Sequence, residues 1–362
     1  MNFCIFMIRE VHHPSSTPTI FNNIRKGKQK MAVSIEDIKK LRAMTGAGLA
    51  DVKKALTEAE GDFDKAKELI RERGLAIAAK RSDRETSNGC VLVKQVDGFA
   101  AMVAIKCETD FVANGQDFIA LVQEILDAAV ANKCKSLDEV KTLKLANGED
   151  AATAVQQRSG VTGEKMELDG YNFLEGENLS VYDHMNKHTL ATIVQLNENN
   201  EDAGHKVAMQ VAAMKPVALD EASIPQSVKD EEFKVAVQKT KEEQIEKAVV
   251  AAIKKAGINA NLVDSEDHIE SNIKKGWLTR EEADKAIEIR NTVAAEKAAN
   301  LNEDMIQNIA KGRLNKFFKE NCLVDQEFQF GDGDKQSVSE WLKAQSKDLK
   351  IVAYKRFTLS AE

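Results

Sequence analysis

The spacing of apolar residues in 34–74 predicts three short helices. Ser34 is a typical N-cap residue, the stretch TGAG at 45–48 interrupts the first helix, and Asp62 is expected to cap the third. Gly74 is expected to end that helix. The expected inward positions are Ile35, Ile38, Leu41, Leu49, Val52, Leu56, Phe63, Ala66, Leu69 and Ile70. Such a unit is a small bundle with little core of its own.

The pattern then changes to short β-rich runs, which predict a hairpin. Residues 90–96 and 99–107 flank Asp97-Gly98, a strong signal for a tight turn between antiparallel strands. Helical spacing returns with Phe118 and continues through Leu126. This part of the chain therefore reads as a hairpin followed by a helix.

A similar order recurs further along the chain. Residues 189–198 predict a strand, and the helix that follows is expected to stop at Lys215-Pro216. The middle of the chain therefore predicts two related α+β halves. The stretch between them, 135–176, reads as a mixture of loop and helix that is rich in turn residues at 159–170.

Residues 227–312 are helical in pattern and highly charged. Ile245, Val249 and Ile253 form a narrow apolar stripe at four-residue steps, and a second such helix follows. The pattern favours a helical hairpin, and the alternative is a disordered acidic linker. Beyond it, the sequence predicts strands at 322–330 and 350–359 and a helix at 337–345.

Composition and charge narrow the function classes. Of 362 residues, 43% are hydrophobic and only 5% aromatic, which favours helix and predicts two or three domains. The formal net charge is −7, whereas a nucleic-acid binder usually presents a basic surface. No apolar run approaches the roughly 20 residues that span a bilayer. We therefore expect a protein or small-ligand partner, with no nucleic acid and no membrane.

The cysteines indicate a reducing compartment. There are five, an odd number, widely scattered and without a C-x-x-C pair: Cys4, Cys90, Cys107, Cys134 and Cys322. Free thiols in this arrangement are typical of a cytoplasmic protein.

Residues 1–30 differ from the rest of the chain. Their apolar part lacks a positive lead and a clear cleavage site, so they make a poor signal peptide. We interpret them as a disordered extension, or as an upstream start that is not used, since strong periodicity begins only after Met31. A transit peptide is the alternative, weakened by the presence of only two arginines and of Glu10.

No catalytic or nucleotide-binding signature is present. The P-loop, dinucleotide, nucleophile-elbow and H-E-x-x-H motifs are all missing, so we expect neither a cofactor nor direct nucleotide binding. His184 and His188 have helical metal spacing, but nothing nearby completes a ligand set, and exposed loop residues are the simpler reading. Cys107 ends an apolar strand and is expected to be a buried structural thiol rather than a nucleophile.

The stretch CETDFVANGQDF at 107–118 remains to be explained. It places a large aromatic ring, Phe111, at the start of a helix. In the simpler interpretation Asp110 is the N-cap and Phe111 packs into the core. In the alternative, Phe111 protrudes as an anchor for a partner, as aromatic hot-spot residues on rigidly held loops do.

Several blocks resemble the elongation factor Ts family, guanine-nucleotide exchange factors for elongation factor Tu in bacterial translation. They are LRAMTGAGLADVKKALTEAEGDFDKAKELIRERG, CETDFVANGQDF, YDHMNKHTLATIVQL, VAMQVAAMKP and KGRLNKFFKENCLVDQEFQF, and the likeness runs in order through residues 32–359. The TGAG and TDFVA blocks together are highly specific.

The resemblance implies an α+β fold with an N-terminal three-helix, ubiquitin-associated-like (UBA-like) domain. Two core subdomains with small antiparallel sheets would follow, the second interrupted by an antiparallel coiled-coil hairpin. With the residue pattern, this divides the chain into the extension 1–30, the UBA-like domain 31–74, a linker 75–88, the core N-subdomain 89–176, the core C-subdomain in two parts, 177–226 and 313–362, and the coiled-coil insertion 227–312.

The resemblance also implies a mechanism and a set of contacts. The TDFVA residues Thr109, Asp110, Phe111, Val112 and Ala113 would meet the nucleotide-binding domain of elongation factor Tu, and the Phe111 ring would displace groups that hold Mg²⁺. The first domain would contact the partner through Arg42, Thr45, Gly46, Ala47 and Gly48. Thr162-Gly163-Glu164 would form a further contact loop, and His184 would meet the partner's non-catalytic domains.

Three features depart from the family pattern. Leu49-Ala50 stands where the family often has two methionines, the insertion 227–312 looks long, and the extension 1–30 is foreign to the family. A C-terminal helix that also clasps the partner is not expected after the last strand.

Alternatives to exchange remain open at this level. The protein could be a scaffold or chaperone-like binder of elongation factor Tu, or an enzyme that uses Cys107 or the histidine pair. A ubiquitin-type ligand for the first domain follows by fold analogy alone. A homodimer, or a 2:2 complex through the coiled coil, is also possible.

Overall fold

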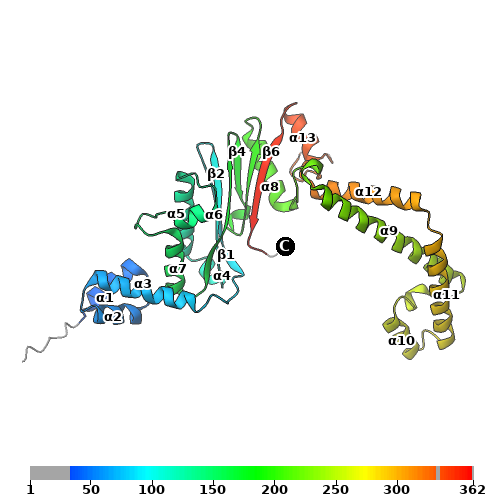
Figure 1. Cartoon of the computed structure of the whole chain (residues 1–362), viewed down its shortest axis with the longest axis horizontal. Coiled ribbons are helices and arrows are strands. Elements are labelled where there is room, and N and C mark those ends of the chain that lie inside the picture. The colour runs from blue at the N-terminus through cyan, green and yellow to red at the C-terminus, as the bar shows by residue number, and fades with distance from the viewer. Residues whose placement is uncertain (1–32, 332–334, 361–362) are drawn as a thin grey trace, which may run out of the picture. The chain divides into compact units, whose positions relative to one another are not determined.

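The computed structural model describes residues 33–331 and 335–360, so the interpretation of residues 1–30 lies outside the described part of the chain. The fold is mixed α+β, as the sequence predicted, with N-terminal helices, two small antiparallel sheets and long packed helices (Figure 1). The chain forms two compact units, 1–70 and 71–362, and each is described by itself.

The first unit holds α1 (Ile35–Thr45), α2 (Leu49–Glu58) and the start of α3 (Phe63–Ala79). The predicted caps are present: Ser34 Oγ accepts from the Asp37 N–H, and an Asp62 carboxylate oxygen accepts from the N–H groups of the residues two and three positions later. The fully buried side chains are Leu41, Val52, Ala55, Leu56 and Ala66.

Two of the predicted inward positions are wrong. Ile35 is 73% exposed and Leu49 is 59% exposed. Each is the first residue of its helix, where the side chain lies beyond the contact between the helices. Gly74 does not end α3 either. An added Cβ there would lie only 3.5 Å from the Gly160 Cα, so this glycine serves close packing of two backbones rather than a cap.

The core of the second unit contains two three-stranded antiparallel sheets. The first has the order β1 (Asn88–Val96), β2 (Phe99–Cys107), β3 (Met166–Glu175), and the second has the order β4 (Leu179–Asp183), β5 (Leu190–Leu196), β6 (Ile351–Thr358). The predicted hairpin turn is present, with positive φ at Asp97 and Gly98. Strand β3 was not predicted, because its glycine and turn-forming residues masked a strand that pairs along the whole of β2.

The two sheets pack face to face between layers of helix (Figure 1). Val91, Met102 and Ala104 meet Leu179, Ala191 and Ile193 in the buried apolar layer between the sheets. On the outer face of the first sheet lie α5 (Gln116–Ala131), α6 (Leu137–Thr142) and α7 (Ala151–Thr162), whereas α8 (Glu201–Met214) covers the second sheet. The short helix α4 (Asp110–Ala113) joins β2 to α5.

Further helices, three of them long, follow α8. They are α9 (Gln226–Lys255), α10 (Glu266–Lys274), α11 (Arg280–Ala299) and α12 (Glu303–Asn321). Helix α9 packs along both α11 and α12, and Val249 and Ile253 are buried as expected. The described chain is therefore helical here rather than a disordered linker. The chain packs back along α9 as two separate helices, α11 and α12. The second follows Asn302, whose side chain caps it by accepting from the Met305 N–H.

The C-terminal part differs from the prediction in one element. Residues 322–330 make only isolated bridges, Cys322 with Ala218 and Glu327 with Ser337, and no continuous strand. Their apolar residues are buried because the segment crosses under α13 (Val338–Gln345), not because they pair in a sheet. Short 3-10 helices complete the described structure at His184–Asn186, Glu221–Ser223 and Ala260–Leu262.

Candidate functional site

The TDFVA residues form a one-turn helix, α4, held between the end of β2 and the start of α5. Thr109 has an extended backbone and is its N-cap, with Oγ1 accepting from the Val112 N–H at 3.4 Å. The expectation that Asp110 is the N-cap is therefore wrong, because Asp110 is already the first helical residue.

Phe111 is 85% exposed, the highest fraction among the large hydrophobic side chains of the described residues. Its neighbours behave differently: Val112 is half-buried against the core and Ala113 is buried. One turn of helix thus directs the small side chain inward and the large ring outward. Core packing does not explain the ring, and contact with a partner remains the interpretation to be tested.

The loop after α7 lies directly against α4. Gly163 ends α7 with a positive φ of 77°, which turns the chain back toward β3. The next residue, Glu164, reaches across: its carboxylate accepts from Thr109 Oγ1 at 2.6 Å and from the Thr109 N–H at 3.1 Å. The structure therefore brings together two predicted site elements, TDFVA and the Gly163 loop, which are about 50 positions apart in the sequence.

A second carboxylate joins the same two segments, this time from the residue before Thr109 to the residue after Glu164. Glu108 accepts from the Lys165 N–H at 2.6 Å and pairs with Arg84 at 3.0 Å. These contacts, the backbone hydrogen bond first, hold the pKa of Glu108 below its usual value. Lys165 Nζ in turn donates to the Arg84 carbonyl at 2.9 Å. The sequence did not identify Glu108, and it gave Glu164 only as part of the contact loop at 162–164, because isolated carboxylates carry no pattern that predicts their contacts.

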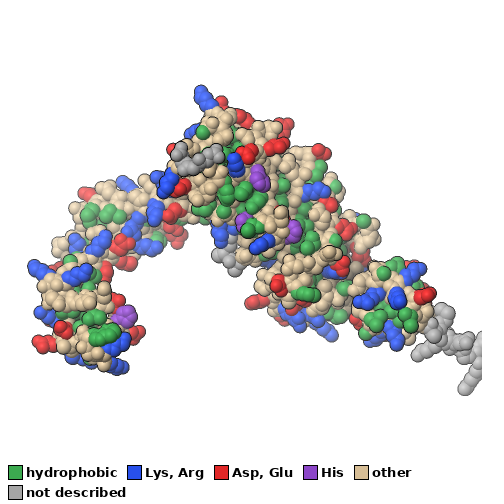
Figure 2. Space-filling model, turned by 180° about the vertical axis from the view of Figure 1, so that it is seen from behind, with side chains coloured by type: hydrophobic (Ala, Val, Ile, Leu, Met, Phe, Trp, Pro, Cys, Tyr) green, Lys and Arg blue, Asp and Glu red, His purple; other side chains and the backbone are tan. Residues whose placement is uncertain are grey.

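His184 lies in the turn between β4 and β5, and residues 187–189 of this turn line a cavity together with Asp110 and Ala113 of α4. The His184 Nδ1 is 3.3 Å from the Tyr182 hydroxyl, and its ring meets that of Tyr182 edge-on. Backbone φ is positive at Met185, Asn186 and His188, so the turn is strained. Histidine side chains lie beside hydrophobic surface on the face shown in Figure 2.

His188 does not pair with His184 as metal ligands would. Its ring Nδ1 is hydrogen-bonded to the Asp183 carboxylate, and its backbone N–H donates to the same carboxylate. Within the described residues no group of three or more metal-ligating side chains comes together. His188 is thus a structural part of the turn.

The predicted residues of the first unit form one loop between α1 and α2. Gly46 has φ 65° and its N–H donates to the carbonyl of Arg42, whose side chain is exposed. Thr45 Oγ1 donates to the Leu41 carbonyl and accepts from the Ala47 N–H. Ala47 is buried, whereas Gly46 and Gly48 are exposed. The loop is therefore a rigid, backbone-rich surface.

The thiol chemistry of the described cysteines is suppressed. Cys107 is fully buried, its Sγ donates to the Thr109 carbonyl, and burial raises the pKa of its thiol to about 12. A neutral thiol is a poor nucleophile. Cys107 is a buried structural residue, as predicted.

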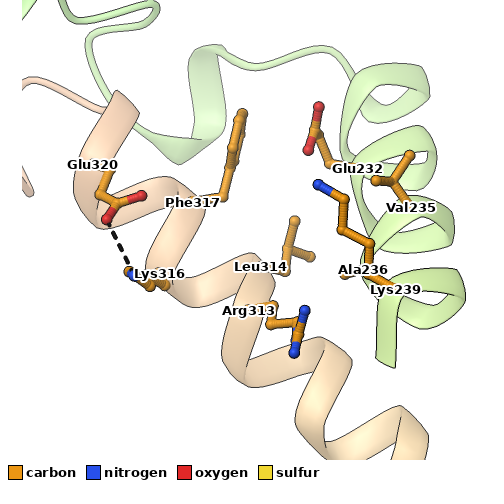
Figure 3. A pocket seen from close by; sticks show the side chains of 9 residues that line it. All are labelled: Glu232, Val235, Ala236, Lys239, Arg313, Leu314, Lys316, Phe317 and Glu320. Atoms are coloured by element: carbon orange, nitrogen blue, oxygen red, sulfur yellow. Dashed lines mark ion pairs between the residues drawn. The ribbon is translucent and has the colours of Figure 1, made fainter. Parts of the chain in front are cut away.

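A groove of about 500 Å³ runs between α9 and α12 (Figure 3). Val235, Ala236, Leu314 and Phe317 form its apolar part. The rim mixes both signs of charge, with Lys316 and Glu320 paired to each other in Figure 3. This mixture does not resemble a phosphate or nucleotide site.

No helix in the described ranges is both long and apolar enough to cross a bilayer.

Comparison with known proteins gives one consistent family. The family model for "Elongation factor TS" matches residues 108–266 and 251–361. The chain is 59% identical over 332 residues to elongation factor Ts of Parabacteroides distasonis and 60% identical to that of Phocaeicola vulgatus. It is 40% identical over 333 residues to that of Porphyromonas gingivalis. In all three comparisons the match covers 92% of this chain and 100% of the relative.

Proposed function

The chain belongs to the elongation factor Ts family, and from that premise we propose that exposed Phe111 is the wedge by which it promotes GDP release from elongation factor Tu. Family membership makes the protein a translation elongation factor of the nucleotide-exchange type, not an enzyme. The wedge, and every other residue assignment below, is our proposal.

The observation that carries the proposal is that Phe111 is exposed on α4, a short helix held in place by the hydrogen bonds of its N-cap Thr109 to Glu164. Burying a phenylalanine ring in a partner supplies roughly 1.5–3 kcal/mol. A support whose backbone is already ordered loses little further conformational freedom on binding, so more of that energy remains to distort the partner. In elongation factor Tu the ring would enter beside the Mg²⁺ site, and a bound Mg²⁺ is a dominant local charge there.

Thermodynamic linkage constrains this mechanism. If the protein weakens GDP binding to elongation factor Tu by some factor, GDP weakens the binding of the protein by the same factor. The exchange factor therefore consumes nothing, and free GTP then occupies the emptied site.

We propose further contacts where residues match the family. Gly163 would meet the GTPase domain beside α4, and His184 would meet the non-catalytic domains. The first unit would bind through the α1–α2 loop, at Arg42 and at Thr45, Gly46, Ala47 and Gly48, which presents exposed glycine backbone. The likeness of this unit to a UBA domain, and the division of the core into two subdomains, belong to the same proposal.

We propose that α9 with α11 and α12 forms an antiparallel coiled-coil arm, and that one copy of the chain binds one copy of elongation factor Tu. The arm buries its own stripe, including Val249, Ile253 and Ala283, within a single chain. The alternative stoichiometry is a homodimer or a 2:2 complex through the arm.

The decisive experiment is release of a fluorescent GDP analogue from elongation factor Tu at fixed Mg²⁺. We expect Phe111→Ala to bind the partner and release GDP at least about tenfold more slowly, the loss of a buried aromatic contact. Trp277→Ala is the matched control, because it removes another aromatic side chain that is 64% exposed. Retained binding with no acceleration of release even by the wild type would favour the scaffold alternative. Equal release by wild type and Phe111→Ala would exclude the wedge.

A further inference from the structure

The two residues directly before α4 and the two residues directly after Gly163 form a reciprocal clasp. Glu164 accepts from the N–H of Thr109, and Glu108 accepts from the N–H of Lys165. The neighbouring residues Glu108 and Thr109 are thus bound to Lys165 and Glu164, which are neighbours on the other segment. Hydrogen bonds to an ionised carboxylate are among the strongest that a protein makes.

Glu164 acts on α4 at its N-cap. It binds both the hydroxyl and the backbone N–H of Thr109, and that same hydroxyl accepts from the Val112 N–H. A helix of one turn has almost no stability of its own, since the first turn of any helix is its costly step. The cap and its partner therefore decide whether α4 is ordered, and with it the direction of Phe111.

The loop that carries Glu164 is itself fixed. Ser159 Oγ donates to the Glu164 carbonyl at 2.5 Å, and the Glu164 N–H donates to Thr162 Oγ1 at 3.3 Å. An added Cβ on Gly163 would lie 3.0 Å from an Arg81 guanidinium nitrogen, so the turn also packs against the segment after α3. The clasp thus connects α4 to a rigid helix end rather than to a mobile loop.

We propose that Glu164 is a positioning residue for nucleotide exchange: through Thr109 it orders α4 and so presents Phe111 to the partner. This rests on the proposed wedge function of Phe111. Glu164 needs no contact with elongation factor Tu in order to act, which distinguishes it from a residue of the interface.

The test compares Glu164→Ala, Glu164→Gln and the matched control Asp169→Asn in the full-length chain. Asp169 is a carboxylate on the following strand that pairs with Lys106, so its substitution makes a similar charge change without contacting α4. Two quantities are measured: hydrogen exchange of the Val112, Ala113 and Asn114 amides in the free protein, and GDP release from elongation factor Tu.

We expect Glu164→Ala to raise exchange of these amides and to slow maximal GDP release, each by about tenfold, as loss of a charge-assisted hydrogen bond does. Glu164→Gln keeps an oxygen that accepts from the Thr109 N–H and should restore part of both effects. Asp169→Asn should leave both unchanged. In the double variant with Thr109→Val, the loss of release rate should be smaller than the product of the two single losses.

Slower release with unchanged amide exchange would overturn the inference, since Glu164 would then contact the partner directly. Faster amide exchange with normal release would overturn it as well, because the clasp would be structural only. Phe111→Ala is measured alongside. If it releases GDP like the wild type, the wedge itself is wrong; if it alone slows release, only the positioning role of Glu164 is wrong.

Discussion

At the scale of single residues, the site depends on which side chains face water. The sequence identified Phe111 as unusual but left two interpretations open. An aromatic residue in the first turn of a helix can either pack into the core or project from the surface. The outcome depends on the turn itself. With Thr109 as N-cap, Ala113 faces the core and Phe111 faces solvent. With Asp110 as N-cap, the helix would begin one residue later.

The described cysteines should be unreactive in the native protein. Burial raises the pKa of Cys90 and Cys107 to about 12 and that of Cys322 to about 11, and Cys134 is raised in the same direction. At pH 8 these thiols are protonated and shielded. In a Cys4→Ser variant we expect a thiol reagent to label no cysteine quickly at pH 8, and four after denaturation. A fast-reacting thiol in the native variant would contradict the burial.

A residue-scale pH dependence follows from Glu108. Its pKa is lowered in the folded protein, chiefly by the Lys165 N–H, so its ionised form stabilises the fold. That contribution is fully present above the unfolded pKa of about 4.3 and is lost as the pH falls through the lower folded value.

We therefore expect Glu108→Gln to be less stable than the wild type at pH 7. The difference should shrink as the pH falls below about 4, where both proteins carry a neutral group at this position. Denaturant unfolding at several pH values measures it. A difference that stayed constant down to pH 2 would show that packing, not charge, is responsible.

At the scale of elements, the sequence predicted what has a local cause. The hairpin at Asp97-Gly98, the Ser34 and Asp62 caps and the helix ending at Lys215 follow from neighbouring residues. Strand β3 and the absence of a strand at 322–330 have distant causes: β3 exists because β2 offers a free edge, and 322–330 is buried by α13. The clasp belongs to the second kind, since Thr109 and Glu164 meet only in the folded chain.

Two glycines in helices test how the elements pack. An added Cβ on Gly160 of α7 would lie 2.2 Å from the Gly74 Cα, so the two backbones could not remain as close. Gly312 of α12 has nothing within 4 Å of such an atom. We expect Gly160→Ala to lower the free energy of unfolding by about 1–3 kcal/mol through overpacking.

Gly312→Ala is the matched control. It should be neutral or raise the free energy of unfolding by up to about 1 kcal/mol, because alanine favours a helix over glycine. Chemical denaturation of both variants measures the contrast. If Gly160→Ala were as stable as Gly312→Ala, close packing of the two helix backbones would not be what excludes a side chain at Gly160.

At the scale of the whole molecule, the chain forms two compact units, 1–70 and 71–362, and the charged helices belong to the same unit as the α+β core. The hydrophobic pattern gives the helical bundle, the core and the charged helices different spacings of apolar positions, and their division into separate domains stays a prediction. The pattern could not show how much of its apolar surface each part of the chain buries against itself. In the arm, Val249 and Ile253 of α9 pack with Ala283 and Ala286 of α11, so this stripe is covered within the chain.

The expected stoichiometry rests on this internal packing of the buried stripe. A coiled-coil dimer needs an apolar seam left for a second copy, and the buried stripe of the arm is already matched internally. We therefore expect the free protein to have the mass of one 40.0 kDa chain in light scattering at micromolar concentration, and to form a 1:1 complex with elongation factor Tu. A dimer mass would instead implicate the groove between α9 and α12, where Phe317 and Leu314 are only half-buried. Phe317→Ser would then have to restore the single-chain mass, because it removes the largest apolar side chain in that groove.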